Sequence, residues 1–153
     1  MINKKVKYSE GDLFIIKLDD VNKVLGLIVR RRGRTKVLLG YFWKFDFEIN
    51  DNLILDKSKA ILITMYSGLG YEIGTWQILG KYGKWNRDDW EVPELSRFAE
   101  ETIGLYFADK YNDDLRSFSE RRITKIEAER LYRHSLHGYI SLENALKKKI
   151  GAS

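Results

Sequence analysis

The sequence predicts a mostly β protein of the α+β class, with a small twisted antiparallel sheet or partly open barrel of about six or seven strands and two C-terminal helices. Three observations favour this fold. Short runs of β-branched and aromatic residues, bounded by Gly, Asp, Asn or Ser, fill the first two thirds of the chain. The last third changes to the period of amphipathic helices. The length of 153 residues is that of one domain, so we expect a single domain over residues 1–153.

The first five predicted strands are short apolar runs. They cover residues 12–18, 24–29, 36–42, 60–66 and 73–79. Several of them are apolar at consecutive positions, which indicates strands that are covered on both faces. The polar or glycine-rich segments 18–23, 30–36 and 66–72 predict hairpin turns between these strands.

Two further apolar runs cover residues 103–107 and 115–123. The turn-like sequence KYNDD, residues 110–114, separates them and predicts another hairpin. With this hairpin, the β-rich part of the chain is expected to extend over about residues 8–123.

Residues 124–151 predict two helices packed against each other. Thr124 and Glu127 have the spacing of a capping box at the start of the first helix, which is expected to end near Gly138. Ser141 is the predicted cap of the second helix. Apolar residues follow at helical spacing, namely Ala128, Leu131, Tyr132 and Leu136 in the first helix and Leu142, Ala145, Leu146 and Ile150 in the second. The last turns hold Lys147, Lys148 and Lys149, where cations suit the helix dipole.

The composition excludes several classes of site. The chain has no cysteine, which excludes a disulfide framework, a thiolate metal site and a cysteine nucleophile. No apolar run approaches the roughly 20 residues that a membrane span needs, and the N-terminus lacks the apolar stretch of a signal peptide. We expect a cytoplasmic protein with no membrane partner, no cofactor and no bound metal.

Candidate catalytic groups are few. His134 and His137 lie three residues apart on the predicted first helix, and a solvated helix end explains them better than a metal site because no ligand lies at a matching spacing. The carboxylate doublets at residues 88–89 and 100–101 would point to opposite faces of a strand. The glycines of residues 68–74 are spaced too widely for a dinucleotide fingerprint. No nucleophile lies beside a base, so we expect no enzyme activity.

Charge is unevenly distributed along the chain. The net charge is +5, with basic residues in excess over residues 1–40 and 111–153 and acidic residues in excess over residues 41–110. The distribution of basic groups matters more than their sum for nucleic-acid binding, because a binding face must neutralise several neighbouring phosphates. The basicity of this chain therefore lies toward its two ends, away from the tryptophan-rich middle.

A basic hairpin tip carries the strongest nucleic-acid signal. Its residues are Arg30, Arg31, Arg32, Arg34 and Lys36. Guanidinium groups bind phosphates well, and the aromatic residues 41–43 could stack on bases. A charged hairpin tip that discourages aggregation explains the same residues, because a basic tip without a wider basic face neutralises few phosphates. A nucleic-acid-binding barrel that uses this hairpin is the alternative function.

Three of the four tryptophans lie within residues 76–90. Trp76 sits in a strand pattern and is expected in the core. Trp85 and Trp90 lie outside any apolar period, among charged residues, and this composition is typical of an interface anchor. Tryptophans folded back over the mouth of a barrel would produce the same pattern. The predicted partner-binding residues are Trp85, Asp88, Asp89, Trp90, Glu91 and Glu94.

Three stretches resemble the bacterial immunity protein 26 family. The opening YSEGDLFIIKLDDVNKVLGLIVRR is similar to the start of that family, and GTWQILGK, with a later tryptophan and VP, resembles its Gly-x-Trp-x-x-x-Gly stretch and downstream proline. The tail ITKIEAERLYRHSLHGYISLENAL resembles its helix, GY turn and short final helix. The family fingerprint falls on Gly11, Asp12, Phe14, Gly26, Trp76, Gly80 and Pro93. These residue types are typical of structural roles in turns and cores.

The resemblance implies a mostly β protein that protects its own cell from a polymorphic toxin, as in contact-dependent inhibition, by binding the cognate toxin domain and blocking it. Immunity proteins against nucleases are often acidic, whereas this chain has a net charge of +5, so a nuclease target would require the acidic segment 41–110 to supply the contact. We expect the carboxylates of residues 88–94 to meet basic groups on the toxin, with Trp85 and Trp90 as anchors.

Overall fold

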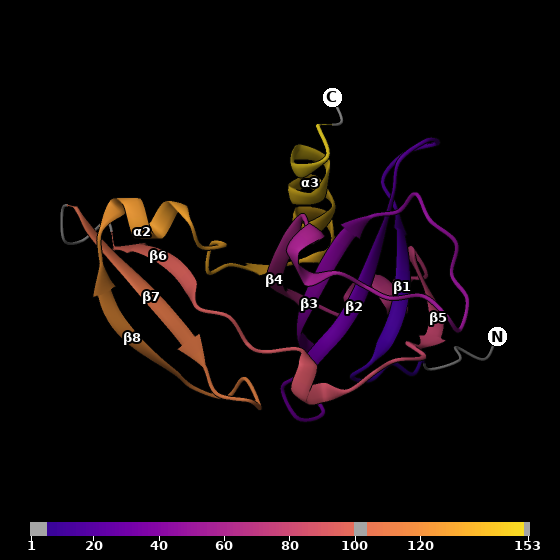
Figure 1. Cartoon of the computed structure of the whole chain (residues 1–153), viewed down its shortest axis with the longest axis horizontal. Helices are drawn as coiled ribbons and strands as arrows, with labels where there is room; N and C mark the ends of the chain where they lie inside the picture. Colours follow the sequence, from indigo (N-terminus) through magenta and orange to yellow (C-terminus); the bar gives the residue numbers. More distant parts are fainter. Residues whose placement is uncertain (1–5, 100–103, 152–153) are drawn as a thin grey trace.

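The computed structural model describes residues 6–99 and 104–151. Within these residues the chain forms nine strands in two sheets and three α-helices, and neither sheet closes into a barrel. The predicted class, mostly β with C-terminal helices in an α+β domain, is confirmed. Figure 1 shows a large sheet backed by a C-terminal helix and, beside it, a smaller sheet that carries a short helix. No helix in the described part of the chain is long and apolar enough to cross a membrane.

The large sheet has the strand order β5-β1-β2-β3-β4-β9. Its strands are β1 (Asp12–Lys17), β2 (Lys23–Arg31), β3 (Val37–Lys44), β4 (Leu62–Ser67), β5 (Trp76–Lys81) and β9 (Leu136–His137). The β1–β2 and β2–β3 pairs are hairpins whose turns lie where the sequence predicts them. All neighbours are antiparallel except β4 and β9, which are parallel.

The predicted hairpin turn at residues 66–72 is wrong. The short helix α1 (Leu69–Ile73) occupies this segment, and β5 pairs with β1 at the far edge of the sheet instead of with β4. Tyr71 explains the helix, because the turn places this side chain in the core, where its hydroxyl lies 2.7 Å from that of Tyr66. Gly70 permits it, since a Cβ there would lie only 2.4 Å from the Trp76 ring.

Both faces of the large sheet are covered by apolar residues. One core contains the rings of Phe14, Phe42 and Trp76 and is covered by α3 (Tyr139–Lys149) through two buried leucines. The other contains Trp43 together with residues from the long connections after β3 and β5. Successive residues of a strand point to opposite faces, so β2 needs an apolar residue at nearly every position. This explains the consecutive apolar runs of the sequence.

The small sheet has the order β6-β7-β8, with β6 (Leu95–Ala99), β7 (Leu105–Tyr111) and β8 (Phe118–Ile123). The β7–β8 hairpin confirms the predicted one, and β6 was not predicted because its sequence, LSRFA, has no apolar period. Helix α2 (Lys125–Glu129) packs against β6 and β7. The backbone links this sheet to the rest of the molecule through Ser96, whose N–H donates to the Tyr132 carbonyl at 2.8 Å.

The C-terminal helices differ from the prediction. The capping box of Thr124 and Glu127 is present, but α2 ends at Glu129 and not near Gly138. The residues that follow leave the helix because β9 adds to the edge of β4. Helix α3 begins at Tyr139, with Gly138 as its N-cap in place of Ser141, and packs against β4 and β9. The two helices therefore cover different sheets and do not form a packed pair.

Candidate partner-binding surface

The segment that joins β5 to β6, residues 82–94, is here named the tryptophan loop. It contains the 3₁₀ helix η2 (Arg87–Asp89), in which the Asn86 side chain accepts a hydrogen bond from the Asp88 N–H at 3.2 Å. A second 3₁₀ helix, η1 (Lys57–Lys59), precedes β4, and the Lys57 ammonium lies 5.4 Å from the Trp90 ring centroid. All six predicted partner-binding residues belong to this loop, so its geometry determines which of them a partner could reach.

Trp90 does not face solvent, and its predicted role as an exposed anchor is wrong. Its side chain is 3% exposed, and its ring meets those of Tyr41 and Trp43 edge-on, with centroids 5.2 and 5.8 Å apart. Burial of this large apolar surface, with edge-to-face contacts, outweighs the preference of its charged neighbours for water. The alternation of Trp90 and Val92 with the exposed Glu91 is the sequence signal that could have revealed the burial.

Trp85 is half-buried and lies over the backbone of Gly11. A Cβ on Gly11 would come within 2.7 Å of the Trp85 ring, and Gly11 has a φ of +92°, so both the close approach and the left-handed backbone require glycine. Part of the indole remains accessible. Trp85 is therefore the tryptophan of the loop that a partner could contact.

Three of the four predicted carboxylates are free to bind a partner. Asp88, Asp89 and Glu91 are exposed, and none of them lies within ion-pair distance of a cation in the described residues. Glu94 is different, because both of its oxygens accept hydrogen bonds from Arg121, at 2.7 and 3.0 Å. These bonds lower the pKa of Glu94, and they occupy the group that was predicted to meet a partner.

Arg30, predicted at the exposed hairpin tip, is buried. It is 3% exposed, because β2 extends through Arg31 and a bulge between Ile28 and Arg30 shifts the register against β3. One of its terminal nitrogens donates to the Val29 carbonyl at 2.8 Å, and the other lies 3.6 Å from Asp113. Its Nε has no hydrogen-bond partner.

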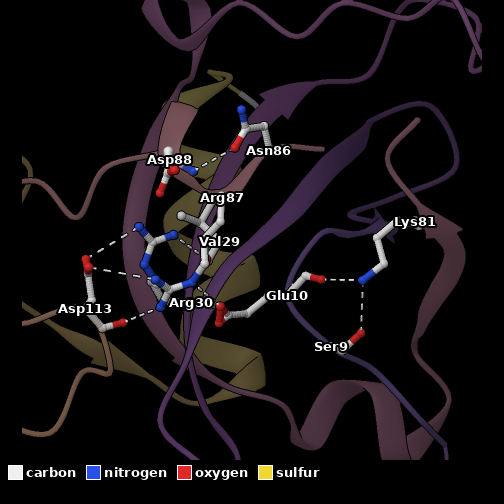
Figure 2. Close-up of polar contacts among 9 residues, drawn as sticks. All are labelled: Ser9, Glu10, Val29, Arg30, Lys81, Asn86, Arg87, Asp88 and Asp113. Atoms are coloured by element: carbon white, nitrogen blue, oxygen red, sulfur yellow. Dashed lines mark hydrogen bonds and ion pairs between the residues drawn. The ribbon is translucent and has the colours of Figure 1, made fainter. Parts of the chain in front are cut away.

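Arg30 and Arg87 meet at Asp113, and this contact joins the basic hairpin to the tryptophan loop. Figure 2 shows both guanidinium groups turned toward Asp113, with Glu10 on their other side. Arg87 donates to Glu10 at 2.8 Å and to the Asp113 carbonyl at 2.9 Å. Burial and the nearby charge of Arg87 lower the pKa of Arg30, while the hydrogen bond to Glu10 raises the pKa of Arg87. The end of β2 and the tryptophan loop are therefore connected through polar contacts to the same aspartate, Asp113.

The other hairpin cations are mostly engaged within the molecule. Arg31 donates to the carbonyl of Tyr8 at 2.7 Å and stacks on its ring, and Arg32 donates to the Leu115 carbonyl at 2.6 Å. Lys36 pairs with Glu72 at 2.6 Å. Arg34 is exposed and pairs with no carboxylate among the described residues. The hairpin thus offers few free cations to a phosphate backbone.

The fingerprint residues lie in strands, turns and the tryptophan loop, and their contacts are structural. Gly26 faces Phe14 across the β1–β2 pair, where a Cβ would lie 2.3 Å from the ring, and Trp76 packs beside Phe14 at 5.9 Å. Gly80 has a φ of +108° next to an irregularity in the β1–β5 register. Asp12 accepts the N–H of Ser9 at 2.9 Å, and Pro93, in the tryptophan loop, follows the buried Val92.

A buried aspartate forms the strongest polar cluster, and sequence reasoning missed it. Asp109, on β7, is fully buried and accepts hydrogen bonds from Arg97 at 2.7 and 3.1 Å. His134 places Nδ1 2.6 Å from Asp109 and Nε2 2.8 Å from the Tyr111 hydroxyl, so it is not the solvated helix end that was predicted. The available signal was an aspartate, Asp109, directly after the apolar run of the strand LYFADKY.

Both imidazole nitrogens of His134 are engaged within the cluster, Nδ1 with Asp109 and Nε2 with the Tyr111 hydroxyl. No group of three or more His, Cys, Asp or Glu in the described residues is arranged to hold a metal ion. The doublet Glu100-Glu101 lies outside the described residues.

Comparisons with known proteins add no relative. A scan against models of protein families, a search of curated proteins and a search of solved structures each found no match to this chain.

Proposed function

We propose that this chain is an immunity protein that binds a cognate bacterial toxin domain and neutralises it by covering the active or substrate-binding surface of that toxin. The main support for this proposal is a group of three exposed carboxylates on the tryptophan loop, Asp88, Asp89 and Glu91, which are unpaired among the described residues. They belong to the same loop as the half-buried Trp85, and the other aromatic residues of this loop, Tyr82 and Trp90, are in the core. The resemblance to immunity protein 26 sequences supplies the class of partner.

The loop is held in place before any partner binds. Trp90 anchors it to the core, and the Tyr41 hydroxyl donates to the carbonyl of Glu91 at 2.7 Å. At the start of η2, Arg87 ties the loop to Glu10 and Asp113. A loop that is already ordered loses little conformational entropy on binding, which favours affinity.

Charge determines the kind of surface that the loop would fit. Three carboxylates without cationic partners favour a basic patch on the toxin and would raise the association rate more than the final affinity. Trp85 would contribute apolar contact beside them, whereas Trp90 and Glu94 take no direct part. Blocking the toxin in this way requires an interface of roughly 1,600 Å² and needs no catalysis and no cofactor. The protein would act in the cytoplasm.

The test is co-expression with the toxin encoded next to this chain, followed by binding kinetics on the purified pair. We expect growth rescue and a stable complex. Replacing the three carboxylates (Asp88→Asn, Asp89→Asn, Glu91→Gln) should slow association about tenfold at low ionic strength and flatten its salt dependence.

A matched triple variant provides the control, since Asp20→Asn, Asp46→Asn and Glu129→Gln remove the same charge from exposed carboxylates outside the loop that are likewise unpaired among the described residues. This control should leave the salt dependence nearly unchanged. Absence of both rescue and complex formation would overturn the proposal. An equal effect of the two triple variants would show that net charge, and not the loop, controls association.

Nucleic-acid binding through the basic hairpin stays a prediction, and the contacts of its arginines speak against it. Arg31 and Arg32 are bound to backbone carbonyls, and Arg30 is buried. A mobility-shift assay at low salt tests this alternative. Binding that weakens when Arg34 becomes Ala would support it, and no shift would remove it.

A further inference from the structure

A hollow of about 680 Å³ lies against β4, between α3 and the chain that leads from α2 to β9. Figure 1 shows α3 standing beside β4, with this connecting chain, residues 130–135, passing close to both. We name the hollow the basic groove, after four cations that line it, Arg130, Arg133, Lys148 and Lys149. The predicted function uses none of them.

The four cations have no acidic partner. None of them forms an ion pair with a carboxylate of the described residues, and Glu129 is the one carboxylate that lines the groove. Lys149 instead lies over the Tyr132 ring, with its nitrogen 5.8 Å from the centroid. Like charges collected in one concavity repel each other and focus a positive potential, so an anion bound there would relieve the repulsion.

Apolar residues also line the groove. Leu62, Leu131 and Ala145 line it beside the half-buried Tyr132, and Thr64 adds a hydroxyl whose bond to the Ser135 carbonyl is long, at 3.3 Å. His137 also lines the groove. Burial lowers its pKa, so its ring is neutral at pH 7 and contributes a hydrogen-bonding group without charge. A ligand that fits this groove has an anionic end that meets the cations and a flat, largely apolar body that contacts Tyr132 and the apolar lining residues.

We propose that the basic groove binds a small phosphate-bearing molecule with an aromatic body, of the nucleotide class. Its volume lies within the roughly 300–1,000 Å³ typical of small-molecule sites. The four free cations line one hollow of small-molecule size, which favours a small ligand over a nucleic-acid strand. This site is independent of the toxin-binding proposal, because the carboxylates of the tryptophan loop that carry that proposal, Asp88 and Asp89, do not line it.

The test uses the full chain, with ATP, adenosine and inorganic phosphate as probes in titration calorimetry. We expect ATP to bind and inorganic phosphate to compete with it. The Kd of adenosine should be at least about tenfold higher than that of ATP. The double variant Arg133→Gln and Lys148→Gln removes one cation from each side of the groove and should weaken ATP binding about tenfold or more. Its circular dichroism and melting temperature should match those of the parent chain.

The control variant combines Lys147→Gln with Arg122→Gln. Lys147 is the neighbour of Lys148 on α3 but does not line the groove, and Arg122 is exposed on β8, so the control removes the same charge outside the groove. It should bind ATP as the parent does. Three results would overturn the proposal: no binding of ATP, equal binding of adenosine, or equal loss in the control. Binding of a short single-stranded oligonucleotide without binding of ATP would also overturn it and would assign the groove to nucleic acid.

Discussion

The two sheets of this protein are held together by different forces. The large sheet has apolar layers on both faces, with the rings of Phe14, Trp43 and Trp76 in closed cores. The small sheet buries little, since its own core consists of Ala108, Ile123 and Ala128, and five of the six residues of β8 are exposed. Its central feature is a charged residue, Asp109, which is fully buried.

This difference determines how each sheet responds to change. Burial of apolar surface is non-directional, so the large sheet depends on volume and tolerates changes of charge around it. A buried carboxylate is stable only while its hydrogen bonds and counter-charge are present, so the small sheet depends on Arg97 and His134. We therefore expect apolar truncations to damage the large sheet most, and loss of one carboxylate to damage the small sheet most.

The largest effect is expected from Trp90→Ala. The side chain is 3% exposed among three aromatic rings, and its removal should lower the free energy of unfolding by about 3–5 kcal/mol in urea denaturation. Trp85→Ala is the internal control, since this half-buried tryptophan should cost less, about 1–2 kcal/mol. Equal losses would mean that Trp90 is not a core residue.

The next effect is expected from Asp109→Asn. The amide can no longer accept two charge-assisted hydrogen bonds from Arg97, and we expect a loss of about 2–4 kcal/mol. Hydrogen exchange should show the loss of protection concentrated in β6, β7 and β8. The exposed Asp113 provides the control, and Asp113→Asn should have a smaller effect. Uniform loss of protection in both sheets would contradict the comparison.

The same carboxylate predicts how acid acts on the small sheet. Burial alone would raise the pKa of Asp109, but the hydrogen bonds from Arg97 and His134 outweigh it, and the pKa lies below its ordinary value. The ionised group therefore stabilises the fold above the unfolded pKa of about 4, and this contribution is lost as the pH falls through the folded value. In the Asp109→Asn variant the exchange of β7 amides should become less sensitive to acid.

Alkali is expected to act on the large sheet instead. Burial, with the Glu91 charge adding, raises the pKa of Tyr41 to about 12. A raised tyrosine pKa means that its stabilising contribution is complete below the unfolded value of about 10 and is lost as the pH rises to 12, a change of about 2 kcal/mol. Unfolding measured against pH should show this decline, and Tyr41→Phe should reduce it. A decline of equal size in the variant would contradict the assignment to Tyr41.

The smallest effect is expected from Arg121→Gln. The side chain of Arg121 is 54% exposed, and its pair with Glu94 spans the surface of the small sheet. Exposed pairs contribute little and salt screens them, so we expect the smallest loss of the series, and it should vanish at high ionic strength. A loss as large as that of Asp109→Asn would mean that surface and buried charges are equally important in this sheet.

The elements that periodicity predicts correctly are those whose residues meet their neighbours locally. The β1–β2, β2–β3 and β7–β8 hairpins join strands that are adjacent along the chain, and the capping box at Thr124 needs only the next three residues. The features that were missed depend on distant partners. Strand β5 was predicted as a strand but pairs at the far edge with β1, and the edge of β4 accepts β9 from residues that otherwise fit a helix.

The candidate site divides in the same way. Composition alone indicates that the tryptophan loop combines tryptophans with charged residues, and it singles out Asp88, Asp89 and Glu91, which are exposed in the structure. The burial of Trp90 and Arg30, and the contact of Arg87 with Asp113, join residues more than twenty positions apart along the chain, so no local pattern contains them.

Hydrophobic period and turn chemistry predict the mostly β class, seven of the nine described strands and the location of a charged, tryptophan-rich surface loop, because they are local properties of the sequence. Which charges stay free depends instead on the folded arrangement. Asp88 and Asp89 remain unpaired while Glu94 is bound by Arg121, and Lys148 remains unpaired while Lys36 is bound by Glu72. An ion pair requires two groups within about 4 Å, and the fold, not the order of residues, sets that distance.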